Sequence, residues 1–217
     1  MNSFLILVRS AVKEVVRMGG KRQEKAAETE QALKAAARRL FAERGYLNTK
    51  ITDITAVAGR AAGSFYNHFA SKEELLQSLL KDLADEGDSR AEGPDHNPDF
   101  TDPEAVRYHI RGYWTAAREH WPVFRAVSQA ALVNEDFARM MGRFSAEQRE
   151  DVLDHLDGFP AAGLRLPSTP DASLTMMFLV ASGLLQAIED GTVDLTDEQA
   201  VEGITRFVYR GLTGRDY

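Results

Sequence analysis

The sequence has no cysteine among its 217 residues. This absence excludes disulfide scaffolds, thiol nucleophiles, zinc ribbons and iron–sulfur clusters, and it fits the reducing cytoplasm. Long apolar runs at the N-terminus are also lacking. The run Phe4–Val8 has no Lys or Arg before it and ends at Arg9, so it is too short for a signal peptide. Alternation of apolar and polar residues with a period of two is almost absent, which argues against strands.

The charge of the chain is unevenly distributed. The formal net charge is −7, but residues 21–72 carry ten Lys and Arg against five Asp and Glu, whereas residues 73–217 have a net charge of −14. Apolar residues make up 44% and charged residues 27%, which is ordinary globular usage and excludes wholesale disorder. The pattern predicts a small basic module joined to a larger acidic one.

Helical periodicity and helix-start signals recur along the chain. An apolar stripe from Leu33 to Phe41 predicts a helix that ends at Gly45, and short helices follow from Thr49 to about residue 58, closed by Gly59, and at about residues 62–68. Later helix starts are marked by Ser71, by Asp102 before a proline, by Trp121, by Asn134, near Asp171 and by Thr196. We expect an all-α fold of about nine helices without strands, with a loop from Gly158 to Pro170.

The three N-terminal helices have the spacing of a helix-turn-helix. The second helix of such a pair must stand free of its own core to enter a major groove about 12 Å wide. Phe65 and Phe69 are four residues apart and are expected to hold the inner face of this helix on the bundle. The residues expected to face outward are Ala62, Gly63, Ser64, Tyr66 and Asn67.

A longer run of residues carries a family resemblance. Gly45-Tyr46, Thr49, Ile51, Asp53-Ile54 and Ala58-Gly59 are followed by Gly63-Ser64-Phe65-Tyr66-Asn67-His68-Phe69 and by Ser71-Lys72-Glu73-Glu74-Leu75. In these positions, over about residues 29–76, the chain resembles the TetR/AcrR family of bacterial transcriptional regulators. The resemblance implies an all-helical homodimer with an N-terminal DNA-binding domain and a divergent C-terminal domain that binds a small effector.

The resemblance also implies roles for single residues. Lys50, Ser64, His68 and Lys72 fall where the family contacts phosphates, and Thr52, Ala62, Gly63 and Tyr66 fall where it meets base edges. Arg60 stands where a valine is usual and is expected to reach a backbone phosphate, Thr55 replaces an alanine, and Ala61 replaces the usual Ser or Thr cap, at a cost of about 0.5–2 kcal/mol. The expected DNA-binding residues are Lys50, Thr52, Arg60, Ala62, Gly63, Ser64, Tyr66, Asn67, His68 and Lys72.

Two C-terminal segments predict a dimer interface. Residues 174–188 are apolar around most of a helix, yet fifteen residues span only about 22 Å, short of a bilayer. Paired across a two-fold axis with the last helix, this segment would form a four-helix interface, as is usual in the family. The expected interface residues are Leu174, Phe178, Ala181, Leu185, Ile204 and Val208. The alternative is a helix wholly inside a monomer.

Rings and methionines concentrate between residues 108 and 144, which suits either a pocket for a hydrophobic ligand or a packed core. The expected ligand-binding residues are Tyr108, Tyr113, Trp114, Trp121, Phe124, Phe137, Met141, Phe144 and Met177. Together with the acidic balance, they favour a neutral or cationic, largely hydrophobic effector. His109 and His120 are eleven residues apart with no carboxylate at metal-binding spacing, so neither a metal nor a cofactor is predicted.

No motif of an enzyme is found: the chain lacks a Walker lysine loop, a Gly-x-Ser-x-Gly elbow and a His-Glu-x-x-His pair. Asp151, Asp154 and Asp157 are interpreted as a solvated helix surface. We expect a cytoplasmic, dimeric repressor that a small effector releases from duplex DNA; the alternative is a helical carrier of lipophilic molecules. The predicted parts are an N-terminal extension at 1–24, either an amphipathic helix or a disordered tail, the DNA-binding domain at 25–72 and the effector-binding and dimerisation domain at 73–217.

Overall fold

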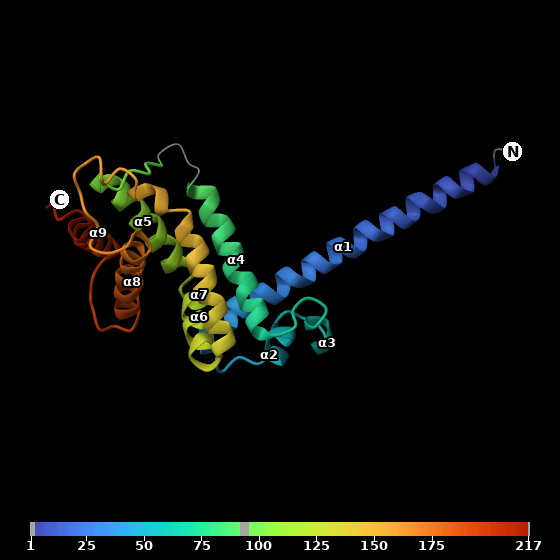
Figure 1. Cartoon of the computed structure of the whole chain (residues 1–217). Coiled ribbons are helices and arrows are strands. Elements are labelled where there is room, and N and C mark those ends of the chain that lie inside the picture. Colours follow the sequence, from blue (N-terminus) through green and yellow to red (C-terminus); the bar gives the residue numbers. More distant parts are fainter. Residues whose placement is uncertain (1–2, 92–95, 217) are drawn as a thin grey trace. The chain divides into compact units, whose positions relative to one another are not determined.

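The computed structural model describes the backbone of residues 3–91 and 96–216, and the side chains of residues 23–86 and 96–216. Over these residues the chain forms nine α-helices and one short 3-10 helix, with no strand (Figure 1). The predicted all-α fold is confirmed. The elements are α1 (Ser3–Arg44), α2 (Ile51–Val57), α3 (Ala62–Phe65), α4 (Lys72–Ala91), α5 (Pro103–Glu119), α6 (Trp121–Val133), α7 (Glu135–Glu150), η1 (Leu153–Leu156), α8 (Pro170–Glu189) and α9 (Asp197–Thr213).

Polar side chains cap the helix starts where the sequence predicts them. Asp102 accepts a hydrogen bond from the Glu104 N–H at 2.9 Å, and Asn134 accepts one from the Phe137 N–H at 3.0 Å. Thr196 and Gln199 form a reciprocal capping box at the start of α9. The start of α8 differs by one residue from the prediction, because Thr169 is the cap and Pro170 is the first helical residue.

The chain divides into two compact units, residues 1–79 and residues 80–217. The predicted boundary after residue 72 coincides with the start of α4, and the N-terminal unit also takes in the first turns of that helix, where Leu75, Leu76 and Leu79 are buried. The backbone of the predicted extension is helical from Ser3 as part of α1, but its side chains up to residue 22 lie outside those described.

The core of the C-terminal unit lies between α5, α8 and α9. Each helix turns one apolar face inward, with Ile110 on α5, Leu174 on α8 and Ile204 on α9 among the fully buried side chains. Helix α7 ends at Glu150, so the acidic residues Asp151, Asp154 and Asp157 lie around the 3-10 helix η1 and not on an α-helical face as predicted.

Helix α8 is the one helix in the described part of the chain whose length and hydropathy would allow it to cross a membrane. A core helix passes the same test, and α8 places Leu174, Met177, Ala181 and Leu185 in the core of its unit. Packing against α5 and α9 accounts for the apolar side chains on this inner face, whereas Met176 and Leu179 of the same helix are exposed in the single chain.

Candidate functional site

The segment that corresponds to the recognition helix is shorter than predicted. The α-helix runs only from Ala62 to Phe65, and residues 66–68 form a turn. In this turn the N–H groups of Asn67 and His68 bond to carbonyls three residues earlier, those of Ser64 and Phe65. Such bonds are typical of a helix end that tightens into 3-10 geometry. The prediction of one seven-residue α-helix was therefore wrong in its second half.

The two faces of this segment are divided as the sequence predicts. The Phe65 side chain is fully buried and Phe69 is 4% exposed, with ring centroids 5.6 Å apart. On the other side the Tyr66 side chain is 62% exposed, and Ala62, Gly63 and Asn67 are exposed as well. The phenylalanine pair thus anchors the segment and leaves a face of small and polar side chains in solvent.

Ser64 belongs to the outward set but is half-buried, and its hydroxyl already donates to the carbonyl of Ala61 at 2.7 Å. This bond is made at the helix start, where Ala61 provides no capping side chain. The Ser64 oxygen keeps its lone pairs, so it can accept a hydrogen bond but cannot donate one to a phosphate without breaking this contact.

The preceding turn is fixed by local polar contacts. Gly45 takes a left-handed φ of 78°, which ends α1 as predicted, and the Thr49 hydroxyl donates to its carbonyl at 2.7 Å. The Asp53 carboxylate accepts from the Lys50 N–H at 3.0 Å and pairs with Arg44 at 3.1 Å. The side chains of Lys50 and Thr52, both predicted to meet DNA, remain exposed at the start of α2.

Lys72 is held inside the N-terminal unit. Its ammonium donates to the carbonyl oxygens of Tyr46 and Thr49, both at 2.8 Å, and lies 3.9 Å from the centre of the Tyr46 ring. These contacts tie α4 to the turn between α1 and α2. Two of the three N–H groups of this lysine are therefore bound within the fold, and only the third is left to donate to the predicted phosphate.

Tyr46 and Glu73 form, together with Lys72, a cluster of contacts at the start of α4. The Tyr46 hydroxyl donates to the Glu73 carboxylate at 2.7 Å. Burial raises the pKa of Tyr46, and the hydrogen bond to the Glu73 carboxylate raises it further. Burial alone would raise the pKa of Glu73, but hydrogen bonds, that from Tyr46 foremost, lower it overall. Burial likewise lowers the pKa of Lys72. The cluster holds α4 against the helix-turn-helix.

The two remaining predicted contacts, Arg60 and His68, are both half-buried. The Arg60 N–H bonds to the Thr55 carbonyl at 2.9 Å, and its side-chain Nε is buried without a hydrogen-bond partner among the described residues. The His68 ring lies 6.3 Å from the Phe69 ring. Both residues border the exposed face and do not lie at its centre.

The predicted dimer interface on α8 and α9 consists mainly of residues that are buried in the single chain. Five of its six residues are between 0% and 5% exposed in the single chain, and Phe178 packs against the same core; the five are Leu174, Ala181, Leu185, Ile204 and Val208. The most apolar stripe of each helix is used by the chain's own core, so it offers no surface to a partner. The apolar side chains left outside are Met176, Leu179 and Phe207, which are 44%, 64% and 66% exposed.

Three of the predicted ligand-binding residues come together at a cavity in the C-terminal unit. Tyr113, Trp121 and Phe124 line a cavity of about 270 Å³, with Ser128, Ser182 and Gln186 providing polar atoms. The Tyr113 ring meets Phe178 edge to face at 5.6 Å. Burial raises the pKa of the Tyr113 hydroxyl, and a hydrogen bond with Ser182 opposes the rise. The hydroxyl is thus a neutral polar group inside an aromatic wall.

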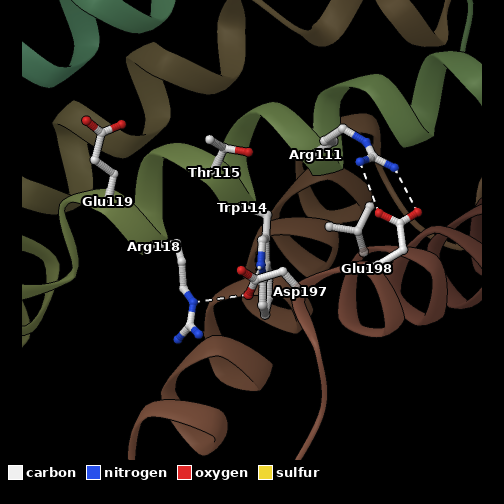
Figure 2. A pocket seen from close by; sticks show the side chains of 8 residues that line it. Arg111, Trp114, Thr115, Arg118, Glu119, Asp197 and Glu198 are labelled. Carbon is white, nitrogen blue, oxygen red and sulfur yellow. Dashed lines mark hydrogen bonds and ion pairs between the residues drawn. The ribbon is translucent and has the colours of Figure 1, made fainter.

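Trp114 belongs to a different cavity, of about 330 Å³, between α5 and α9 (Figure 2). Its ring is 2% exposed, and its indole N–H donates to the Asp197 carboxylate at 3.0 Å. Arg111 pairs with Glu198 at 3.0 Å, and Arg118 pairs with Asp197 at 3.0 Å. In Figure 2 these pairs flank the tryptophan, so this cavity is lined by ion pairs around a single indole ring.

The other predicted ligand-binding residues are dispersed. Phe137 and Met177 are each 3% exposed, and Met177 belongs to the core between α5, α8 and α9. Met141 and Phe144 are half-buried on α7, and neither lines the two cavities described above. Tyr108 lies next to a group of histidines, with its ring 6.1 Å from that of His96.

The spacing argument paired His109 with His120, but the structure gives His109 different neighbours. His96 and His155, which lie far from it in sequence, approach its ring to 5.1 and 4.7 Å. Burial lowers the pKa of His109 to about 4, although a hydrogen bond with the Ala105 carbonyl opposes this shift. No spacing rule for one helix could find this cluster, because its members come from three separate segments.

Comparison with known proteins identifies the N-terminal domain. Residues 33–79 match the model for bacterial regulatory proteins of the tetR family. The chain is 38% identical over 81 residues to the HTH-type transcriptional regulator TtgR of Pseudomonas putida, which covers 37% of this chain and 38% of TtgR. It is 50% identical over 46 residues to the HTH-type transcriptional repressor KstR2 of Mycobacterium tuberculosis, which covers 21% of this chain and 23% of KstR2. The likeness to both relatives thus spans well under half of their length.

Solved structures resemble most of the chain in fold. A TetR-family regulator from Syntrophomonas wolfei matches 85% of this chain and 94% of its own, with a TM-score of 0.69 at 21% identity. A transcriptional regulator from Saccharomonospora viridis, solved in complex with choline, matches 87% of this chain and all of its own, with a TM-score of 0.69 at 18% identity. Residues 33–79 therefore match the tetR family of bacterial regulatory proteins, and the solved structures show that the chain shares their fold.

Proposed function

We propose that the protein is a homodimeric transcriptional repressor that binds duplex DNA through the segment Ala62–His68 and is released by a small molecule. The observation that carries this proposal is the exposed face of that segment, held in place by buried Phe65 and Phe69. A face of small and polar side chains on a short anchored helix suits the major groove. The match of residues 33–79 to the tetR family model supports it.

On this face and at the start of α2 we assign two kinds of contact. We assign base edges to Tyr66 and to the small residues Ala62 and Gly63, because they are exposed on α3 and in the turn after it. Lys50 is exposed at the start of α2 and is placed to meet a phosphate. Phosphate contacts supply affinity and its salt dependence, whereas contacts to bases supply discrimination.

We place the dimer interface on the outer faces of α8 and α9. Met176, Leu179 and Phe207 are large apolar side chains exposed on these helices, and such side chains favour association. Gly183, one turn beyond Leu179 on α8, lets another helix approach closely. A two-fold dimer binds two half-sites about 34–36 Å apart, which matches a palindromic operator.

We assign the effector to the cavity lined by Tyr113, Trp121 and Phe124. Its volume of about 270 Å³ suits a compact molecule, and its rings suit an apolar or cationic one. The choline bound to the similarly folded protein from Saccharomonospora viridis is a cation of this size class. Effector binding would favour a dimer whose recognition segments no longer match two half-sites, with a coupling of about 1–3 kcal/mol.

The relatives are regulators, and we propose no catalytic activity and a cytoplasmic location, where the operator DNA is. The test is a titration with duplex DNA containing the promoter of the protein's own gene, and with a shuffled duplex, at two salt concentrations. A repressor prefers the promoter duplex, and its affinity falls steeply with salt. A protein that binds lipophilic molecules but neither duplex would instead be a carrier, and the proposal would fail.

A further inference from the structure

A group of three histidines lies in the C-terminal unit, apart from the aromatic cavity and the DNA-binding segment. His96 precedes α5, His109 lies on α5 and His155 lies on η1. The Nε2 atom of His96 is 3.2 Å from that of His109 and 3.0 Å from that of His155. One ring nitrogen of each residue lies within 4.8 Å of the other two. The segment before α5, α5 itself and η1 therefore bring three imidazole nitrogens close together.

Hydrogen bonds fix which nitrogen of two rings carries the proton. The Nδ1 of His109 lies 2.9 Å from the Ala105 carbonyl, and the Nδ1 of His155 lies 2.6 Å from the Asp154 carboxylate. Both oxygens can only accept, so each Nδ1 donates and each neutral ring presents the lone pair of its Nε2. A carboxylate or carbonyl behind the ring is the arrangement that orients metal-binding histidines.

The hydrogen bonds inside the group are incomplete without a cation. The Nε2 of His96 carries at most one proton and can donate to only one of the two lone pairs that face it. The other contact, at about 3 Å, is between two lone pairs unless a metal ion or a further proton lies between them. Two nitrogens bound tetrahedrally at 2.0–2.1 Å are about 3.3–3.4 Å apart, so the two Nε2 distances from His96 need to change by only a few tenths of an ångström to take a metal ion.

The surroundings hold the rings in place. The buried Phe100 ring meets His109 and His155 edge-on at 4.9 and 5.1 Å, and the Phe100 N–H bonds to the His155 carbonyl at 3.1 Å. Asn97 donates to the Asp102 carboxylate at 3.0 Å, which fastens the segment that carries His96 to the start of α5. A site arranged in this way loses little order when it binds an ion.

We propose that His96, His109 and His155 bind one divalent transition-metal ion of the zinc class. Imidazole nitrogens suit Zn²⁺, Ni²⁺ and Cu²⁺, whereas Mg²⁺ and Ca²⁺ require oxygen ligands. Three protein nitrogens leave a coordination position open, as in zinc sites that bind a further molecule. The ion joins α5 to η1 and to the segment before α5, one helical turn from Tyr113 of the aromatic cavity.

The test is a titration of untagged, EDTA-treated full-length protein with ZnCl₂, followed by calorimetry and by thermal unfolding. We expect one Zn²⁺ per chain and a melting temperature that rises with Zn²⁺ concentration. His96→Gln should weaken binding by at least about 100-fold, and Asp154→Asn by about 10–100-fold. His120→Gln is the control, because His120 lies in the same unit outside the group, and it should bind as the wild type does.

His155 is 4% exposed, so His155→Gln tests the fold as well as the site. His96 is half-buried on a loop, and its variant keeps the proposal testable if His155→Gln unfolds. Failure of the wild type to bind Zn²⁺, Ni²⁺ or Co²⁺, or equal binding by His96→Gln, would overturn the site. The readout is metal content and stability, so its result is independent of whether the protein binds DNA.

Discussion

Lys72 shows how a side chain that the sequence predicts to contact DNA can also stabilise the fold of the N-terminal unit. Its ammonium joins two carbonyl oxygens of the turn between α1 and α2 and covers the Tyr46 ring. Tyr66, six residues earlier, is the opposite case, because its ring is 62% exposed and only one edge contacts Phe65. Two residues of one motif therefore differ in what their loss should change.

Lys72→Ala should destabilise the N-terminal unit. It removes two hydrogen bonds from a charged donor, which contribute about 1.5–3 kcal/mol each at most and less together. We expect a loss of roughly 2–3 kcal/mol in the free energy of unfolding, measured by urea titration. Lys81→Ala, an exposed lysine on the same helix, is the control and should change it by less than about 0.5 kcal/mol. Equal stability of the two variants would contradict the structural role of Lys72.

Tyr66→Ala and Lys50→Ala should weaken DNA binding in different ways. Lys50 is placed at a phosphate, so its loss should weaken all duplexes about equally and reduce the salt slope by about one. Tyr66 is placed at base edges, so its loss should also reduce the ratio of promoter to shuffled binding. Both side chains are exposed, and melting curves should stay unchanged. The assignment of Tyr66 is wrong if both variants leave the ratio unaltered.

Among the helices, α8 and α9 each have a buried apolar face and an exposed apolar face. The inner face, with Leu185 and Ile204, is buried in the core of the unit, whereas Leu179 and Phe207 remain exposed. A helix that is apolar around most of its circumference is compatible with both uses, but burial decides which residues serve which. Substitutions on the two faces should therefore have separable effects.

Leu179→Glu should give a folded monomer, because the side chain is 64% exposed in the single chain and the new charge is hydrated there. Leu185→Glu should instead unfold the C-terminal unit, since it buries an unpaired carboxylate in the core. Analytical ultracentrifugation and circular dichroism distinguish these outcomes. Leu132→Glu changes an 85% exposed residue of α6 and should leave the dimer intact. A Leu179→Glu variant that stays dimeric would exclude this face as the interface.

Across the whole molecule, α5 carries three different environments. His109 belongs to the histidine group, Tyr113 lines the aromatic cavity, and Trp114 faces Asp197 of α9. Successive residues on a helix point about 100° apart, so neighbours such as Tyr113 and Trp114 contact different parts of the unit. Helix α5 therefore connects the cavity proposed for the effector with the core that α8 and α9 share.

The two tryptophans should report on the effector differently. Trp121 lines the aromatic cavity, whereas Trp114 lines the cavity walled by ion pairs. A compact hydrophobic or quaternary ammonium ligand should quench the fluorescence of Trp114→Phe, which retains Trp121, and leave that of Trp121→Phe nearly unchanged. The same ligand should release the wild type from promoter DNA. Quenching confined to Trp121→Phe would move the effector to the other cavity.

Local residue patterns were enough to predict the helical fold, the caps at Asp102, Asn134 and Thr196, and the inward position of Phe65 and Phe69. These features depend on residues within one or two helical turns, where spacing fixes geometry. Packing between distant segments was needed to show that Lys72 is held by carbonyls, that Leu185 and Ile204 are core, and that Tyr113 and Trp114 line different cavities. The histidine group shows the reason most clearly. His96, His109 and His155 meet through the packing of three segments, and no local pattern encodes contacts between residues so far apart in the chain.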